Sequence, residues 1–242
     1  MVDSTTLDAL RRAALKRDGT SPVIIWYGPG RSRIELSGAT LANAAAKAAN
    51  LLAEEIEPAE LIRLELPLHW QLPVWLAACA AGGWPVEVGP SSGRASLTVT
   101  NEVPTITSGR VVLVSLDPFG LPGTPAPPGV IDAAIEARAQ PDHFSPVVPP
   151  SGRDVALSIG DRQWTSNEMV AAAHGLVVEL GLRFGDRLST QRPATDLRGV
   201  LAALWAPLAA GAAAVLLGPG ADVELAAQEA TSAHVNSSRT GR

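Results

Sequence analysis

The stretch ALSIGDRQWTSNEMV, residues 156–170, joins a strand-like apolar run to the start of a helix. The run 156–159 has the composition of a buried strand, and Gly160-Asp161-Arg162 ends it. Thr165 and Glu168 match a capping box, in which the threonine accepts from the N3 amide and the glutamate reaches back to the N-cap amide. The stretch therefore predicts a strand, a tight turn and a helix that begins next to Thr165.

A strand-to-helix junction of this kind binds phosphate in many enzymes, because a helix N-terminus offers unpaired N–H groups and the positive end of its dipole. A phosphate cradle also needs several glycines for close backbone approach, hydroxyl groups and a cation. This turn has one glycine, an aspartate that would repel phosphate, and one arginine. We therefore predict that the junction does not bind phosphate.

The order of elements around this stretch occurs twice along the chain, which indicates an internal repeat. RIELSGATLANAAAKAANLLAEE (33–55) aligns with RQWTSNEMVAAAHGLVVELGL (162–182), so that Leu36 meets Trp164 and Leu41 meets Met169. VWLAACAAGGWPVEVGP (74–90) aligns with VLAALWAPLAAGAAAVLLGP (200–219). Both copies read turn, helix, strand, helix, glycine and strand.

Strand and helix signals alternate along the first copy. A helix capped by Ser4 or Thr5 comes first, and GPGRS (28–32) is typical of a hairpin turn. Strands are predicted at 22–27, 33–36, 61–66, 85–88, 97–100 and 111–116, and helices at 38–55, 71–81 and 130–139. This alternation predicts an α/β fold of two related α/β subdomains, with largely parallel sheets covered by helices.

The expected domain boundaries follow the repeat and the prolines. They are an N-terminal helix at 1–20, a first α/β subdomain at 21–139, a Pro-rich linker at 140–152, a second subdomain at 153–231 and a disordered tail at 232–242.

Composition excludes several classes of function. The net charge is −5 and no basic cluster stands out, so nucleic acid and anionic membranes are poor partners. No apolar window is long enough to cross a membrane, and the N-terminus lacks the pattern of a signal peptide. The single cysteine, Cys79, allows no internal disulfide, and four scattered histidines give no metal site. We expect a soluble cytoplasmic protein without a cofactor.

The repeat carries a family resemblance. RIELSGATLANAAAKAANLLAE, LIRLELPLHWQLPVWLAACAAGGWPVEVGP and GLRFGDRLSTQRPATDLRGVLAALWAPLAAGAAAVLL together resemble the N-terminal part of the AMP-forming adenylating ligases. That superfamily includes acyl-CoA synthetases, firefly luciferases and the adenylation domains of peptide synthetases. The resemblance covers residues 20–220 and is strongest to a small group of short, single-copy proteins from high-GC bacteria.

The resemblance implies an active site that this chain does not match. In the ligases, the strand similar to DVALSI (154–159) runs into a loop, TSGTTGxPKG, that wraps the ATP phosphates. Here only residues 160–163 separate that strand from the segment similar to the helix start. The adenine-binding Y-G-x-T-E motif, the ribose-binding aspartate and the catalytic lysine of the ligases do not occur. We therefore interpret the chain as a short, degenerate relative without adenylating activity.

Three residues are candidates for binding a small ligand: His69, Trp70 and Arg192. His69 and Trp70 follow the strand at 61–66, and Arg192 has the corresponding place in the second copy. Ligands of open α/β sheets bind at the carboxyl ends of strands. A capping or packing role for His69 is the alternative, and Cys79, which alanines flank, is expected to be a core residue.

These observations leave three functions open. The first is a catalytically inactive binding or regulatory protein that pairs with itself or with a full-length synthetase. The second is a small-molecule binding module that holds an acyl, adenylyl or coenzyme A group in the cleft between the repeats. The third is an enzyme of changed chemistry, which would need titratable groups with perturbed pKa values in one pocket.

Overall fold

The computed structural model describes residues 6–103, 109–222, 224 and 233–235. Its helical segments are α1 (Leu7–Arg17), the 3-10 turn η1 (Pro29–Arg31), α2 (Gly38–Glu55), α3 (Gln71–Gly82), α4 (Ala133–Ala139), α5 (Ser166–Leu180), α6 (Leu197–Val200), the π-helical turn η2 (Leu201–Trp205) and α7 (Ala206–Ala210). Its strands are β1 (Pro22–Tyr27), β2 (Arg33–Ser37), β3 (Ile62–Glu65), β4 (Val86–Glu87), β5 (Leu97–Thr100), β6 (Arg110–Leu113), β7 (Ile131–Asp132), β8 (Val155–Ile159), β9 (Arg162–Thr165), β10 (Arg187–Thr190), β11 (Ala213–Leu217) and β12 (Ala233–Val235).

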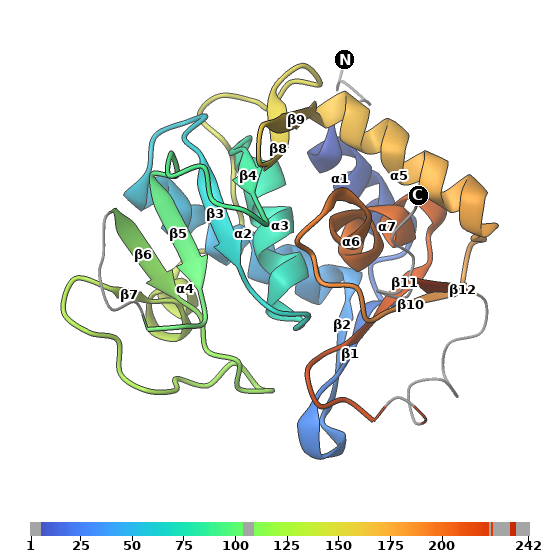
Figure 1. The fold of residues 1–242 in the computed structure, drawn as a ribbon, viewed down its shortest axis with the longest axis horizontal. Coiled ribbons are helices and arrows are strands. Elements are labelled where there is room, and N and C mark those ends of the chain that lie inside the picture. The colour runs from blue at the N-terminus through green and yellow to red at the C-terminus, as the bar shows by residue number, and fades with distance from the viewer. Residues whose placement is uncertain (1–5, 104–108, 223, 225–232, 236–242) are drawn as a thin grey trace.

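The strands form two sheets with helices between and around them (Figure 1). One sheet has seven strands in the order β7-β6-β5-β3-β4-β8-β9, and the other has five in the order β12-β10-β11-β1-β2. Neighbouring strands pair in parallel except for two antiparallel hairpins, β1–β2 and β8–β9. The prediction of an α/β fold with largely parallel, helix-covered sheets is confirmed.

The repeat of the sequence is also present in the order of the structural elements. In the first copy the order is β2, α2, β3, α3 and β4, and in the second it is β9, α5, β10, the helical segment from α6 to α7, and β11. The sheets, however, combine strands of both copies. In the seven-stranded sheet β3 and β4 lie beside the hairpin β8–β9, and in the five-stranded sheet β10 and β11 lie beside the hairpin β1–β2. Each copy therefore contributes its hairpin to the other copy's sheet, and the sheets cross the boundary expected at 140–152.

Helix α1 lies between the two copies and contacts α2 and α3 of the first and α5 and α7 of the second. Leu7, Leu10 and Ala14 are buried on its inner face. The backbone N–H of Leu7 donates to Oγ of Ser166 at 2.9 Å, which joins the first turns of α1 and α5. The N-cap of α1 is Thr6, and the Ser4 and Thr5 that were expected to cap it lie outside the described residues.

The Pro-rich segment 140–152 is held against α2. Nζ of Lys47 donates to the carbonyl oxygens of Arg138 and Gln140, at 3.0 and 2.7 Å. Nδ2 of Asn50 donates to the carbonyl oxygens of Pro141 and His143. The segment that was expected to be a linker therefore packs along α2 of the first copy.

Most predicted elements are present, with four local differences. The predicted strand 111–116 is β6, which ends at Leu113, and the predicted helix 130–139 begins only at Ala133 because Asp132 caps it by accepting from Ala134 N. Residues 162–165, expected to lead directly into a helix, form β9 first. In the tail expected to be disordered, Ala233–Val235 form β12 beside β10, and the rest of 232–242 lies outside the described residues.

Candidate functional site

The hairpin β8–β9 closes with a turn of two residues. Ile159 pairs with Arg162, so Gly160 and Asp161 alone make the turn, and Gly160 has a φ of 57°. A glycine with positive φ at the first central position is typical of a tight type II′ hairpin. The guanidinium of Arg162 lies over the ring of Trp164, 5.0 Å from its centroid. The turn therefore has no room for a loop that could wrap phosphate groups.

The N-terminus of α5, which follows β9, is occupied by its own side chains. The carboxylate of Glu168 accepts hydrogen bonds from the backbone N–H and from Oγ1 of Thr165, both at 2.7 Å. These two bonds hold the pKa of Glu168 below its usual value. The capping box predicted from the sequence is confirmed. A carboxylate thus lies at the helix end where a bound anion would otherwise be expected.

A buried ion pair lies on the strands next to this hairpin. Glu87 on β4 is fully buried and accepts from Nη1 of Arg63 and from the backbone N–H of Ser92, both at 2.9 Å. Burial alone would raise the pKa of Glu87, but the hydrogen bonds from Ser92 and Arg63 lower it overall. Sequence reasoning missed this pair, although the glutamate within PVEV, a strand otherwise apolar, was a signal that could have revealed it.

His69, at the end of β3, is almost fully buried. Its ring packs edge-on against Trp26 at 4.4 Å and tilted against Trp70 at 5.4 Å between centroids. Nδ1 accepts from the backbone N–H of Gln71 at 3.3 Å, so a neutral ring carries its proton on Nε2. Nε2 has no hydrogen-bond partner of good geometry among the described residues.

The surroundings of His69 keep the ring neutral. Burial lowers the pKa of His69 to about 4, and hydrogen bonding to the Leu116 backbone and the charge of Asp117 oppose that shift. The neutral imidazole accepts from the first backbone N–H of α3 through Nδ1. The packing role considered for His69 is therefore present.

Arg192 lies at the end of β10 and is bound within its own turn. Its Nε donates to both carboxylate oxygens of Asp196 at 3.0 Å, and its Nη2 also contacts that carboxylate. Asp196 in turn caps α6 by accepting from Gly199 N at 2.8 Å. No recorded contact among the described residues joins Arg192 to His69 or Trp70. The structure brings His69 and Trp70 together and gives Arg192 a separate, structural pairing.

Two glycines at strand ends allow the backbones of the two copies to approach closely. A Cβ on Gly89, after β4, would lie 2.6 Å from the carbonyl oxygen of Thr195, and a Cβ on Gly218, after β11, would lie 2.7 Å from that of Leu68. Each copy thus places its last strand against the loop that precedes the second helix of the other copy. Both aligned segments of the repeat end in Gly-Pro, and close backbone approach is the physical reason for the glycine.

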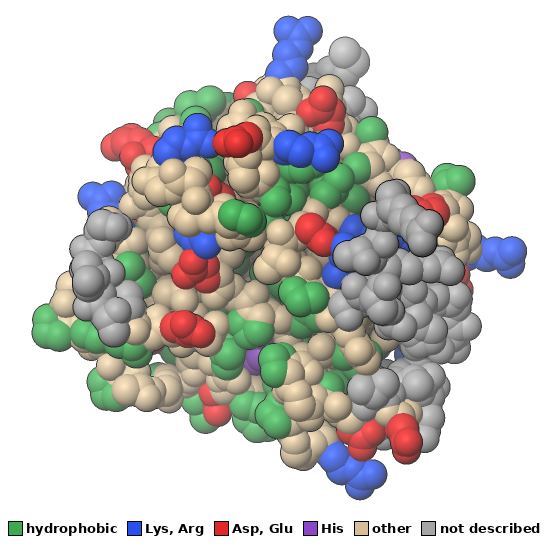
Figure 2. Space-filling model, in the orientation of Figure 1, with side chains coloured by type: hydrophobic (Ala, Val, Ile, Leu, Met, Phe, Trp, Pro, Cys, Tyr) green, Lys and Arg blue, Asp and Glu red, His purple; other side chains and the backbone are tan. Residues whose placement is uncertain are grey.

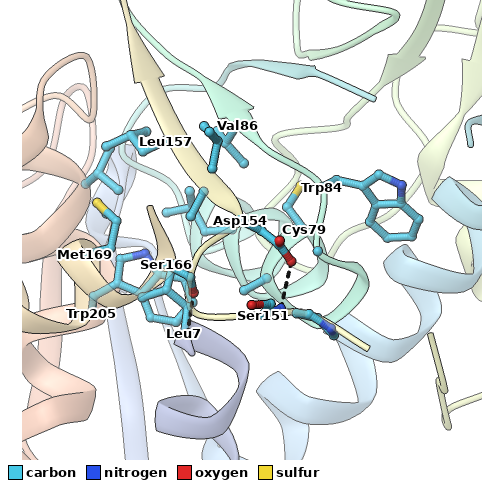
Figure 3. A pocket seen from close by; sticks show the side chains of 17 residues that line it. Leu7, Cys79, Trp84, Val86, Ser151, Asp154, Leu157, Ser166, Met169 and Trp205 are labelled. Carbon is cyan, nitrogen blue, oxygen red and sulfur yellow. Dashed lines mark hydrogen bonds between the residues drawn. The ribbon is translucent and has the colours of Figure 1, made fainter. Parts of the chain in front are cut away.

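A small apolar cavity lies between α1, α3, α5, β8 and η2 (Figure 3). Leu7, Cys79, Met169 and Trp205 line it, and its volume is about 30 Å³, enough for a water molecule but too small for an acyl chain. Cys79 is fully buried and burial raises the pKa of its thiol well above the ordinary value, which confirms the prediction of a core residue. His69, Trp70 and Arg192 do not line this cavity.

The described residues contain no group of three or more His, Cys, Asp or Glu side chains placed to hold a metal ion. None of the helices in that part of the chain is both long and apolar enough to cross a membrane.

The two sheets, their exchanged hairpins and the helices between them define the fold of the N-terminal part of an adenylating ligase. An acyl-CoA synthetase of Brucella canis matches with a TM-score of 0.75 and 20% identity, over 93% of this chain and 46% of that chain. An anthranilate CoA ligase in complex with anthranoyl-AMP matches with a TM-score of 0.67 and 15% identity, over 87% and 44%. A nonribosomal peptide synthetase matches with a TM-score of 0.66 and 17% identity, over 88% and 23%.

These likenesses establish the fold alone, and the chain spans less than half the length of each of the three proteins. A protein of Mycobacterium tuberculosis (strain ATCC 25618 / H37Rv), named as a TIGR03089 family protein, is 33% identical over 238 residues. That similarity covers 89% of this chain and 90% of the relative. The chain belongs to the TIGR03089 family. A scan against protein-family models finds no match.

Proposed function

We propose that this protein is a binding or regulatory protein with the fold of an adenylating ligase that does not form acyl-adenylates. The observation that carries the proposal is the two-residue turn of the hairpin β8–β9. The ligases that the chain resembles have a loop rich in serine, threonine and glycine at that position. Gly160 and Asp161 cannot replace it, because they supply neither the run of backbone N–H groups nor the cation that ATP phosphates require.

The charges around the turn support the same proposal. Asp161 is exposed at its tip, and the Glu168 carboxylate occupies the first turn of α5. Two carboxylates at this junction disfavour the binding of a polyanion such as ATP. The cation of the turn, Arg162, lies over the ring of Trp164. We also propose that the protein acts in the cytoplasm.

The experiment that tests this function is ATP–pyrophosphate exchange, which reports adenylate formation with any carboxylic acid. The assay would use the full chain with Mg²⁺, ATP and pools of fatty, aromatic and amino acids. We expect no exchange above that of a protein-free blank. Exchange that depends on one acid, saturates with ATP and falls in an Arg162→Ala variant would contradict the proposal.

A second candidate function is the binding of a small acyl, adenylyl or coenzyme A group, which the position of His69 and Trp70 just after the carboxyl end of β3 favours. A thermal-shift screen with ATP, AMP, coenzyme A, acyl-coenzyme A esters and fatty acids tests it. A ligand at a hundredfold excess over Kd would raise the midpoint by roughly 5 °C or more. A shift that the His69→Asn variant loses would support this second function, and no shift across the panel would exclude it for these ligands.

A further inference from the structure

Strand β2 is an edge of the five-stranded sheet, since among the described strands it pairs with β1 alone. Figure 1 draws the turn end of the hairpin β1–β2 projecting from the body of the molecule. Figure 2 shows acidic and basic side chains gathered at that lower end of the molecule. The outer side of an edge strand presents a row of backbone N–H and C=O groups to which another strand can add.

The hydrogen-bond pattern of the hairpin fixes which backbone groups of β2 point outward. The N–H of Gly28 donates to the carbonyl oxygen of Ser32 at 2.9 Å, so these two residues form a hydrogen-bonded pair. Such pairs alternate with non-hydrogen-bonded pairs along an antiparallel ladder, and the next bonded pair is therefore the one that includes Ile34. The backbone groups of Ile34 point toward β1, and those of its two neighbours, Arg33 and Glu35, point away from it.

The other side of β1 leads to the same pattern. Tyr27 is the residue of β1 that lies opposite Arg33. The carbonyl oxygen of Tyr27 accepts from the backbone N–H of Gly218 at 2.9 Å, just after β11. Because the backbone of Tyr27 bonds on the side of β11, its pair with Arg33 is a non-hydrogen-bonded one, and the backbone groups of Arg33 lie along the outer edge of the sheet.

The two residues whose backbones point outward carry opposite charges. Arg33 and Glu35 are two residues apart in the strand, so their side chains lie on the same face of the sheet. Nη2 of Arg33 contacts the carboxylate of Glu35 at 2.5 Å, and the two side chains are 35% and 37% exposed. Ile34 lies between them on the opposite face, where it is half-buried and packs against the core.

We propose that β2 is the interface of a homodimer, in which two copies join their edge strands antiparallel about a two-fold axis through Ile34. This axis places Arg33 opposite Glu35 of the partner subunit, and the symmetry repeats that pair. Both residues direct their backbone groups outward, so each opposed pair exchanges two backbone hydrogen bonds. The two Ile34 side chains meet as a close cross-strand pair of β-branched residues. The two five-stranded sheets thereby become one continuous sheet.

The order of the charges selects both the partner and the register. An axis through Arg33 would oppose two guanidinium groups, and an axis through Glu35 would oppose two carboxylates, which is destabilising. The axis through Ile34 opposes unlike charges and keeps the outward backbone groups in register. A strand that matches β2 in this way must itself read Arg-x-Glu, because antiparallel pairing reverses the order, and β2 has that order. A second copy is therefore a self-complementary partner.

The oligomeric state and the exchange of backbone amide protons test the location of the interface. This inference goes beyond the proposed function and does not depend on whether adenylates form. We expect a mass of about twice 25.0 kDa by light scattering at roughly 100 µM, with dissociation on dilution, as for a small interface.

Hydrogen exchange followed by NMR distinguishes the two sides of β2. The amide protons of Arg33 and Glu35 should exchange more slowly in the concentrated dimer than in the dilute monomer. The amide proton of Ile34 is the internal control, since it bonds to β1 and should be equally protected in both. A protein that is monomeric at every concentration, or a dimer in which the amides of Arg33 and Glu35 gain no protection, would overturn the proposal.

Charge reversal tests the register. Arg33→Glu and Glu35→Arg each replace two attractive pairs by two repulsive ones, because the axis repeats every contact, and each should weaken the dimer roughly tenfold or more. An equal mixture of the two variants restores opposite charges across the axis, and so does the double variant Arg33→Glu with Glu35→Arg. Both should associate about as well as the wild type.

Arg198→Glu is the matched control for charge reversal. It disrupts an exposed ion pair between α6 and Glu179 on α5, and it should leave the dimer intact. Circular dichroism spectra of all the variants should match that of the wild type. A mixture and a double variant that associate no better than the single variants would contradict the proposed pairing, whatever the effect of each single change.

Discussion

His69 shows at the scale of one residue how burial and hydrogen bonding select a protonation state. The ring lies between Trp26 and Trp70, and its Nδ1 caps the helix that follows. Protonation would remove that acceptor and bury a charge between apolar rings, which is why burial lowers the pKa of His69 to about 4. The neutral form is therefore part of what holds the end of β3 in place.

The stability of the protein should fall as the pH is lowered through this range. Because the folded pKa lies below the ordinary value of 6.5, the unfolded chain binds the extra proton, and the contribution is full above pH 6.5 and lost toward pH 4. We expect the free energy of unfolding to fall by about 2 kcal/mol between pH 6.5 and 4.5. Urea unfolding at several pH values measures this.

The matched variant is His69→Asn, whose side-chain oxygen can still accept from Gln71 N. It should be less stable than the wild type at pH 7.5 but should lose the slope between pH 6.5 and 4.5. An unchanged slope in this variant would show that other groups cause the pH dependence.

The sequence predicted part of this site. The position of His69 and Trp70 at a strand end followed from the alternating pattern of LIRLEL and the helix after it. The ion pair of Arg192 with Asp196, four residues later, was not predicted. It competes with anion binding only once the turn is folded. The Arg63–Glu87 pair joins residues on neighbouring strands, and the single glutamate of PVEV was its one signal in the sequence.

At the scale of elements, the strand ends that carry Gly89 and Gly218 join the two copies. Gly89 has a φ of 74° and faces the carbonyl oxygen of Thr195. A side chain there would meet two penalties, a left-handed backbone and a clash with backbone that cannot move away easily.

Substitution of Gly89 therefore tests how tightly the copies are joined. Gly89→Ala is expected to lower the free energy of unfolding by about 3 kcal/mol, from backbone strain plus overpacking. Gly93 is the matched control, because its φ is 70° and a Cβ there would meet nothing within 4 Å. Gly93→Ala should cost about 1 kcal/mol, from backbone strain alone. Equal losses in the two variants would mean that the contact with Thr195 adds nothing.

At the scale of the whole molecule, the two copies depend on each other because they exchange hairpins. The repeat and most of its elements were predicted from the sequence, since local periodicity and turn residues specify them. The exchange of hairpins was not predicted, because the apolar pattern of a strand does not indicate which other strand it will pair with. Boundaries drawn from the prolines at 140–152 therefore separate segments that share both sheets.

Helix α1 adds to this dependence, since it packs between the copies. Leu10→Ala on its buried face should lower the free energy of unfolding by about 3 kcal/mol. Ala13→Ser on its exposed face is the control and should change little. Far-UV circular dichroism and tryptophan fluorescence should report the same shifted midpoint in urea. Separate transitions for the two probes would show that the copies unfold independently.

The proposed lack of adenylating activity depends most on the inability of the hairpin β8–β9 to hold ATP phosphates. The most direct measurement is isothermal titration of Mg·ATP into the full chain at neutral pH. We predict no binding heat up to roughly 1 mM ATP, a concentration at which a working site of ordinary affinity would be well occupied. Saturable one-to-one binding that weakens when Arg162 is replaced by alanine would contradict this inability and would place a nucleotide site at this turn.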